Sequence, residues 1–248
     1  MTEFMINILY EDSDLWVIDK PSGVVVNRAE SVLEATIQDW AEERCKILDS
    51  RFKNEEETTK LFLERSGIAH RLDKETSGCL IVAKNPPALS LLMQQFKARK
   101  VLKTYFALVH GKLQPREGFW RLPISRSLTN RARFRVKPGG KMAETGYQVI
   151  NYYQTGNKET VTEVELKPKS GRTHQLRVHL SFLKHPVVSD SKYGNRRYRA
   201  DISWCPRLYL HAGAITFEQP ITHKKITAES PLPKDLSQAK QSLAKIST

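Results

Sequence analysis

Short alternating segments dominate the hydrophobic pattern of this chain. Residues 8–27 have the pattern of a strand, a turn, a second strand and the turn sequence "KPSG". Residues 103–113 alternate between apolar and polar positions, residues 207–217 are also strand-like, and short strands continue to about residue 167, with "KPGG" (137–140) as a hairpin turn. A period of two is typical of half-buried strands, so strands make up most of the predicted elements.

Helical signals are fewer. Ser31 and Glu34 have the spacing of a capping box, which predicts a helix that begins near residue 32. Asn85 as the N-cap and Pro86 as the first helical residue predict a second helix. Residues 171–186 predict a third, which ends at a proline. Because strands and helices do not alternate regularly, the pattern favours an α+β fold with a mixed, mainly antiparallel sheet.

The length and the absence of linkers indicate one domain. The 248 residues contain no internal repeat and no linker rich in glycine and serine. We predict a single domain over residues 1–235 and a polar, frayed C-terminal tail over residues 236–248. Residues 49–60 show no apolar period and are expected to form an exposed excursion.

The charge of the chain favours a polyanionic partner. Forty lysines and arginines oppose 27 aspartates and glutamates, which leaves a formal net charge of +13. Binding a nucleic acid would neutralise phosphates and release counterions. Arg131, Arg133 and Arg135 alternate in "RARFRV", so a strand there would place all three on one face, toward a phosphate backbone or simply toward solvent. A second basic segment, "SKYGNRRYRA" (191–200), contains tyrosines that could stack on bases or pack inside the protein.

The remaining composition argues against several classes of protein. Three cysteines without a CxxC pair indicate a reducing compartment, and the chain has neither a signal peptide at its start nor an apolar run of membrane-spanning length. We therefore expect a cytoplasmic protein. Motifs for phosphate loops, dinucleotides and zinc proteases are missing, and the seven histidines are scattered, so we expect no metal site.

Asp73 is the most conspicuous carboxylate. It lies in "HRLDKETSG" (70–78), directly before the aliphatic run "CLIVA" (79–83). If residues 68–73 are extended, Arg71 lies on the same face as Asp73 and keeps that carboxylate ionised. An ionised carboxylate at a strand end can act as a nucleophile or base, but Asp73 could equally cap a turn.

The helix expected over residues 172–184 carries a second candidate. Leu176, Leu180 and Leu183 share a core-facing stripe, and Arg177 lies beside it. Its guanidinium should therefore point into the domain, where it needs a carboxylate. Arg172 would lie in the first turn, where its charge opposes the helix dipole unless a phosphate binds there.

These motifs together resemble a known family. "HRLDKETSGCLIVAK" and "GRTHQLRVHL" are similar to the signature pair of RluA-type pseudouridine synthases. "KPSG", "KTYFALVHG", "HPVVSDSKYG" and "RLYLHA" match further family blocks in the same order, and the likeness covers about residues 8–232. Some relatives carry an S4-type RNA-binding domain ahead of these blocks, whereas this sequence begins directly with them.

The resemblance implies a fold, an activity and site residues. The fold is the pseudouridine synthase fold, in which two fused subdomains share one sheet around a central basic cleft. The activity is the isomerisation of uridine in RNA, without metal or organic cofactor. Asp73 matches the essential aspartate, Tyr105 the tyrosine that packs on the target base, and Arg177 the arginine that pairs with the aspartate. Arg71 and His70 belong to the predicted RNA contacts, together with Arg131, Arg133, Arg135 and Arg172.

Several alternatives stay open at this point. Asp73 could attack the sugar or abstract a proton from it, and the RNA could be ribosomal or transfer RNA. A catalytically silent RNA-binding module could use the same scaffold. A glycoside hydrolase would need a second carboxylate facing Asp73, and Glu75 is too close in sequence to provide it. A monomer is the default expectation.

Overall fold

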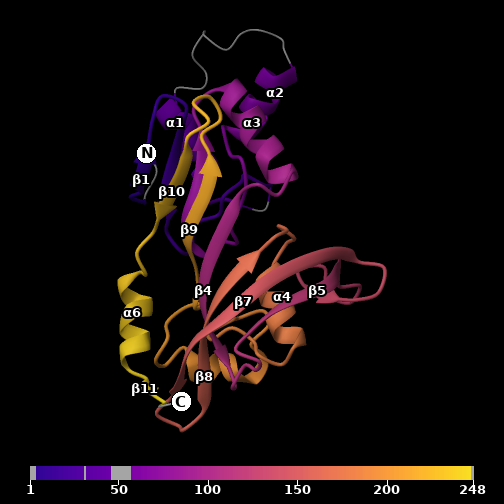
Figure 1. Cartoon of the computed structure of the whole chain (residues 1–248), viewed down its shortest axis with the longest axis vertical. Coiled ribbons are helices and arrows are strands. Elements are labelled where there is room, and N and C mark those ends of the chain that lie inside the picture. Colours follow the sequence, from indigo (N-terminus) through magenta and orange to yellow (C-terminus); the bar gives the residue numbers. More distant parts are fainter. Residues whose placement is uncertain (1–3, 31, 46–56, 247–248) are drawn as a thin grey trace. The chain divides into compact units, whose positions relative to one another are not determined.

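The computed structural model describes residues 4–30, 32–45 and 57–246 of the chain (Figure 1). It divides into two compact units. Unit 1 comprises Met1–Leu102 and Ala214–Ser230, and unit 2 comprises Lys103–Gly213 and Pro231–Thr248. The chain therefore passes from one unit to the other three times. Ser31 of the predicted capping box and residues 49–56 of the predicted excursion lie outside the described residues.

The described part of unit 1 combines antiparallel strands with three helices. The strands follow the order β1-β2-β3-β9, and β10 pairs with β9. Their bounds are β1 Asn7–Glu11, β2 Leu15–Lys20, β3 Ser77–Ala83, β9 Leu210–Glu218 and β10 Lys225–Glu229. The helices are α1 Ile37–Cys45, α2 Glu57–Arg65 and α3 Pro86–Lys97. Every residue of β3 is buried, as its continuous apolar sequence predicts for a strand covered on both faces.

Local capping explains where two of these helices begin. Asn85 accepts a hydrogen bond from Ala88 N at 2.9 Å, so the predicted start of α3 is confirmed. The predicted helix start near residue 32 is wrong, because α1 begins at Ile37. Thr36 and Asp39 form the capping box instead: Thr36 N donates to Asp39 Oδ2 at 2.7 Å, and Asp39 N donates to Thr36 Oγ1 at 3.2 Å.

Unit 2 is built on an antiparallel arrangement of longer strands. Their order is β4-β8-β7-β5-β6, and β11 pairs with β7. The bounds are β4 Leu102–His110, β5 Glu117–Arg126, β6 Phe134–Val136, β7 Lys141–Gln154, β8 Thr160–Pro168 and β11 Ala244–Lys245. The helices are α4 Gln175–Phe182, the 3-10 turn η2 Asn195–Arg197, α5 Tyr198–Asp201 and α6 Lys234–Gln241. The predicted α+β class with a mainly antiparallel sheet is therefore confirmed.

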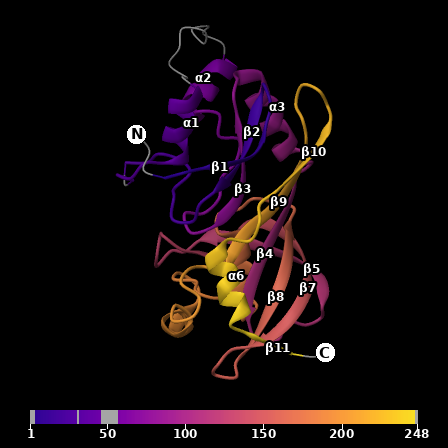
Figure 2. The ribbon, with the colours of Figure 1, turned by 90° about the vertical axis from the view of Figure 1, so that its left-hand side faces the viewer.

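Two features of unit 2 differ from the sequence prediction. The "KPGG" turn joins β6 to β7, but both strands pair with β5 rather than with each other, so it is not a hairpin turn. Residues 236–246 are not a frayed tail. Leu236 is fully buried in the core, Lys240 pairs with Glu163 of β8 at 2.9 Å, and α6 lies along that strand (Figure 2).

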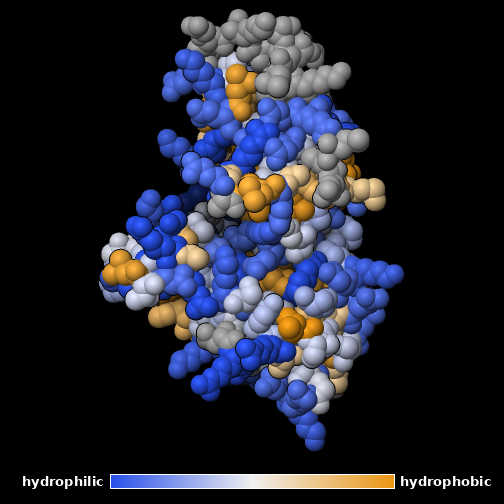
Figure 3. All heavy atoms as spheres, turned by 180° about the vertical axis from the view of Figure 1, so that it is seen from behind, coloured by the Kyte–Doolittle hydropathy of each residue, from blue (hydrophilic) through white to orange (hydrophobic). Residues whose placement is uncertain are grey.

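The surface is mainly polar. Figure 3 shows one face on which hydrophilic residues predominate and apolar residues form small separate groups. Among the described residues, no helix is both long enough and apolar enough to cross a membrane.

Candidate active site

The segment that leads to Asp73 is a loop rather than the predicted strand. Within residues 68–73, only Ile68 forms a bridge, to Val82 of β3. Ile68 and its neighbour Ala69 are both buried, so the expected alternation of faces is wrong. The chain turns directly after Asp73, where Thr76 N donates to Asp73 O at 3.1 Å. Asp73 is half-buried and Arg71 is exposed, which leaves both side chains accessible from solvent.

A buried lysine fastens this turn. Lys20, at the end of β2, has an exposed fraction of 0%. Its ammonium donates to Pro21 O at 2.7 Å, Val24 O at 2.8 Å and Lys74 O at 3.2 Å. The first two bonds fold the "KPSG" turn around the ammonium, and the third ties that turn to the residue after Asp73. Because a buried ammonium needs such acceptors, the two turns are held in register.

Two further hydrogen bonds join the same turns. Gly23 N donates to Lys74 O at 2.8 Å, and Ser22 Oγ donates to Glu75 O at 2.7 Å. Gly23 has a φ of +87°, a conformation that a residue with a Cβ rarely adopts. The sequence identified "KPSG" as a turn but missed its bonds to the Asp73 turn. The sequence feature that could have indicated these bonds is a lysine placed directly before proline at the end of an apolar strand.

His70 holds the other side of the loop. Its Nε2 accepts a hydrogen bond from Ile81 N of β3 at 3.0 Å, and its ring lies 4.6 Å from that of Phe96 of α3. An accepting Nε2 carries no proton, so the ring is neutral in this arrangement. These contacts position the loop, while the predicted contact of His70 with RNA stays a prediction.

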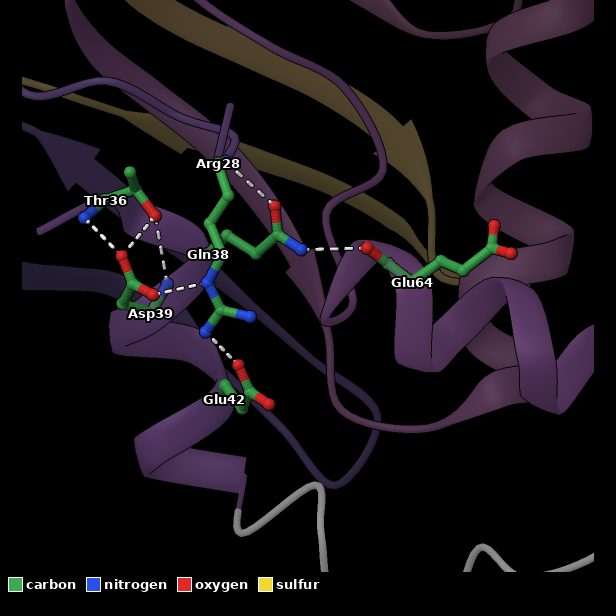
Figure 4. Close-up of polar contacts among 6 residues, drawn as sticks. All are labelled: Arg28, Thr36, Gln38, Asp39, Glu42 and Glu64. Carbon is green, nitrogen blue, oxygen red and sulfur yellow. Dashed lines mark hydrogen bonds and ion pairs between the residues drawn. The ribbon is translucent and has the colours of Figure 1, made fainter. Parts of the chain in front are cut away.

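The segment after "KPSG" is anchored to α1 (Figure 4). The Arg28 guanidinium lies between Asp39 and Glu42 and pairs with both. The Gln38 side chain accepts from Arg28 N at 3.1 Å and donates to Glu64 O at 2.8 Å. The far end of this segment reaches the Asp73 turn, because Glu34 pairs with Lys74 at 2.8 Å.

In unit 2, α4 begins three residues later than predicted. His174 adopts a left-handed conformation with a φ of +52°, and the helix starts at Gln175. The Gln175 side chain ties this start to β7, because its Nε2 donates to Glu144 O at 2.9 Å. Arg172 is exposed and precedes the helix, so its predicted place in the first turn is wrong. Its contact with RNA stays a prediction.

Arg177 is buried as the helix stripe predicts, and its observed partner is Asp190. Arg177 is 1% exposed and Asp190 is 0% exposed. Arg177 Nε donates to Asp190 Oδ2 at 2.8 Å, and Nη2 donates to Asp190 Oδ1 at 2.7 Å. The guanidinium also lies 5.4 Å from the centre of the Tyr193 ring. Sequence reasoning missed Asp190, although its motif "HPVVSDSKYG" was noted. The predicted pair of Arg177 with Asp73 joins two units and stays a prediction.

Tyr105 lies near the start of β4, opposite Leu166 of β8. It is partly buried and packs against the core of unit 2. Two residues earlier, and on the same strand face, Lys103 is half-buried, and desolvation lowers the pKa of its ammonium. A partly accessible ring beside a poorly hydrated cation is chemically suited to a nucleotide.

The predicted arginine strand is only partly a strand. Arg135 lies in β6, whereas Arg131 and Arg133 lie in the preceding turn, so the three do not share one strand face. All three are exposed, and their contact with RNA stays a prediction. Tyr193 is 7% exposed, and its hydroxyl contacts Phe134 N at 2.9 Å and His174 Nδ1 at 2.8 Å. It is therefore an internal residue rather than a platform for bases.

Metal-binding groups do not gather in the part of the chain that the structure describes. No group of three or more His, Cys, Asp or Glu side chains is arranged there to hold an ion. The three cysteines are free, and burial raises the pKa of each thiol, to about 11 for Cys45 and Cys205 and about 12 for Cys79. These thiols are therefore protonated and poorly nucleophilic near neutral pH.

Comparisons with known proteins point to one family across nearly the whole chain. Residues 14–182 match the family described as RNA pseudouridylate synthase. The chain is 35% identical to the uncharacterized RNA pseudouridine synthase YlyB of Bacillus subtilis, over 97% of this chain and 73% of that protein. It is also 35% identical to the ribosomal large subunit pseudouridine synthase C of Vibrio cholerae, over 94% and 67%. The solved structure of human RNA pseudouridylate synthase domain containing 1 superposes with a TM-score of 0.72 at 28% identity, covering 98% of this chain and 89% of that one.

Proposed function

The chain belongs to the RluA-type family of RNA pseudouridylate synthases and is an isomerase that acts on RNA; from this premise we propose that it isomerises specific uridines with Asp73 as the reacting carboxylate. The similarity to a ribosomal large subunit synthase favours ribosomal RNA over transfer RNA as its substrate. We further propose that it acts as a cytoplasmic monomer without a metal or organic cofactor.

The single observation that supports the role of Asp73 most strongly is its fixed turn. Asp73 is half-buried, and the residue that follows it is bonded to a fully buried ammonium. A carboxylate on such a turn keeps its position relative to a bound sugar, and fixed geometry lowers the entropic cost of reaction. Asp73 then either attacks the ribose or removes a proton from it, and both routes require the ionised form.

Arg177 and Tyr105 complete the proposed site from unit 2. We assign to Arg177 the pairing with Asp73, which would keep that carboxylate charged when water leaves the site. We assign to Tyr105 a flat surface for the target base. The uridine must leave its stack to expose the bond between N1 and C1′, which costs a few kcal/mol. Contacts of exposed arginines with the phosphates offset this cost, and the assigned residues are Arg71, Arg131, Arg133, Arg135 and Arg172.

The reaction conserves every atom of the uridine except one exchanged hydrogen. The N1–C1′ bond breaks, the uracil turns within the site, and a new bond forms between C5 and C1′. The hydrogen on C5 leaves as a proton to solvent, and N1 takes up a proton. Exclusion of water protects the activated ribose from hydrolysis in the interval. Release of tritium from C5-labelled RNA therefore reports the reaction directly.

The test replaces Asp73 by asparagine. Tritium release from RNA labelled at uracil C5 should vanish, while RNA binding persists, because asparagine keeps the shape but not the charge. Glu75→Gln is the matched control, because it removes a carboxylate from the same turn and should retain activity. Full activity of Asp73→Asn would refute the assignment. A wild-type protein that binds RNA but releases no tritium from any cellular RNA pool would instead indicate a silent RNA-binding module.

The substrate nucleotide can be found in cells. Pseudouridines mapped in a strain that lacks this gene should be missing at the modified positions. Sites lost from ribosomal RNA support the proposed substrate, and sites lost only from transfer RNA contradict it.

A further inference from the structure

The pair formed by Arg177 and Asp190 has a geometry that serves orientation. We propose that Asp190 is the positioning residue for Arg177, and that with Tyr193 it fixes which edge of the guanidinium faces the reacting carboxylate. This inference rests on the proposed function, in which Arg177 pairs with Asp73. Neither Asp190 nor Tyr193 touches the substrate in this proposal, since both act through Arg177.

Asp190 occupies one defined edge of the guanidinium. Its two oxygens accept from Arg177 Nε and Nη2 at 2.8 and 2.7 Å. A guanidinium has five N–H groups in one plane, so this contact leaves three others, two on Nη1 and one on Nη2. One N–H of Nη1 and one of Nη2 share the edge that we assign to the reacting carboxylate. The Tyr193 ring lies against the guanidinium with a separation of 5.4 Å and limits its rotation out of that plane.

Asp190 is itself held rigidly. Its Oδ1 also accepts hydrogen bonds from Lys192 N and Tyr193 N, both at 2.9 Å. Gly194 N donates to Asp190 O at 2.8 Å, and a Cβ on Gly194 would lie 2.5 Å from that same oxygen. The backbone thus closes tightly around Asp190. A carboxylate fixed in this way restricts the position and orientation of the guanidinium that it binds.

Stability alone gives a weak reason for this pair. Burying two charges carries a desolvation cost, which their attraction only roughly offsets. The pair of Arg207 with Asp235 offers a comparison, because it uses the same Nε and Nη2 edge, at 2.5 and 3.0 Å. Its side chains are 16% and 41% exposed, against 1% and 0% for Arg177 and Asp190. The chain therefore forms the same contact at the surface, where desolvation costs less.

The experiment compares Asp190→Asn with Asp235→Asn in the full chain. Asparagine at residue 190 keeps the shape and one acceptor oxygen, but replaces the other oxygen with a donor that cannot bind the guanidinium. Single-turnover tritium release is measured at saturating RNA, and RNA affinity and the fraction of binding-competent protein are measured by titration. We expect Asp190→Asn to lower the rate by about ten- to a hundredfold while RNA affinity stays within about twofold. Asp235→Asn should change neither quantity.

Tyr193→Leu is the second variant, in case Asp190→Asn does not fold. It keeps the charge of Asp190 but removes the ring beside the guanidinium, and it should lower the rate several-fold with RNA affinity unchanged. A wild-type rate per binding-competent molecule in either variant would overturn the proposal. A fall in rate that only follows a fall in competent protein would also overturn it, because a purely structural role predicts that result. These outcomes are separate from the Asp73→Asn test, which can fail or succeed independently.

Discussion

Lys20 in unit 1 and Arg177 in unit 2 are both fully buried cations, but the fold accommodates them in different ways. Lys20 donates to three backbone carbonyl oxygens, which draw two turns together. Arg177 binds a carboxylate through two parallel hydrogen bonds. Carbonyl dipoles can surround a compact ammonium from several directions, whereas a planar guanidinium needs an acceptor in its own plane. The lysine therefore fixes backbone, and the arginine fixes the direction of a side chain.

His179, in the same helix as Arg177, shows a third way in which the fold accommodates a buried ionisable side chain. It has an exposed fraction of 0%, and its Nδ1 lies 3.4 Å from Thr145 Oγ1. Burial lowers the pKa of its imidazole to about 4, so the ring stays neutral at physiological pH. A neutral imidazole avoids the desolvation cost of a buried charge, whereas Arg177 offsets that cost by pairing with Asp190.

The largest expected effect comes from removing the arginine alone. Arg177→Met leaves Asp190 charged and buried, and it should lower the free energy of unfolding by about 3–5 kcal/mol. Adding Asp190→Asn should recover much of this loss, because the amide still accepts from the backbone but carries no charge. Urea unfolding followed by tryptophan fluorescence measures both variants. Equal stability of the single and double variants would show that the buried charge has little influence.

Removing the lysine should have a smaller effect on stability. Lys20→Met removes the ammonium from three carbonyl oxygens, of which Lys74 O keeps its hydrogen bond from Gly23 N, and should cost about 2–3 kcal/mol. It should also loosen the Asp73 turn, so the Gly23 amide, which donates to Lys74 O, should exchange its hydrogen faster. Lys84→Met is the control, since Lys84 pairs with Glu11 elsewhere in unit 1 and should leave that amide unchanged. Unchanged exchange in Lys20→Met would mean that the lysine does not hold the turn.

The neutral histidine predicts a dependence on acid. The pKa of His179 is about 4 in the folded protein and about 6.5 when unfolded, so the unfolded chain binds more protons between these values. Stability is therefore fully present above pH 6.5 and falls as the pH is lowered toward 4, by about 2 kcal/mol at pH 5. His179→Gln should lose less stability than the wild type over this range.

The smallest effect is expected at the surface pair. Asp235→Asn breaks a contact with the same geometry as that of Asp190, but its carboxylate is 41% exposed. Water can solvate Arg207 after the change, so the loss should stay below about 1 kcal/mol. Thermal unfolding measures it. A loss as large as that of Arg177→Met would contradict the distinction drawn from burial.

Sequence reasoning succeeded where the deciding interaction is local. Asn85 caps α3 through a residue three positions away, and Arg177 is buried because of its place beside Leu176 and Leu180 on one helix. It failed where contacts between segments distant in sequence determine the local structure. The loop at residues 68–74 is held by Ile81, which bonds His70, and by Lys20, which bonds Lys74, and both are separated from it in sequence. Asp190 lies in a turn without periodicity, so nothing in the pattern marked it as the partner of Arg177.

The same contrast applies to the candidate site. The motifs identified Asp73, Tyr105 and Arg177 through their likeness to a family, whereas Lys20 and Asp190 became visible only through their contacts. Charge patterning placed Arg131, Arg133 and Arg135 correctly at the surface but assigned them to one strand. A six-residue pattern cannot distinguish a strand from a turn followed by a short strand, because both expose alternate residues.

The path of the chain through unit 1 has a consequence for its synthesis. Two of its strands, β9 and β10, contain residues that lie beyond position 213. These residues follow the first segment of the unit, which ends at Leu102, by more than a hundred positions. A ribosome must therefore deliver nearly the whole chain before this unit can close its sheet. A fragment ending at Leu102 would lack both β9 and β10, so the two units cannot be obtained as separate products by a single cut.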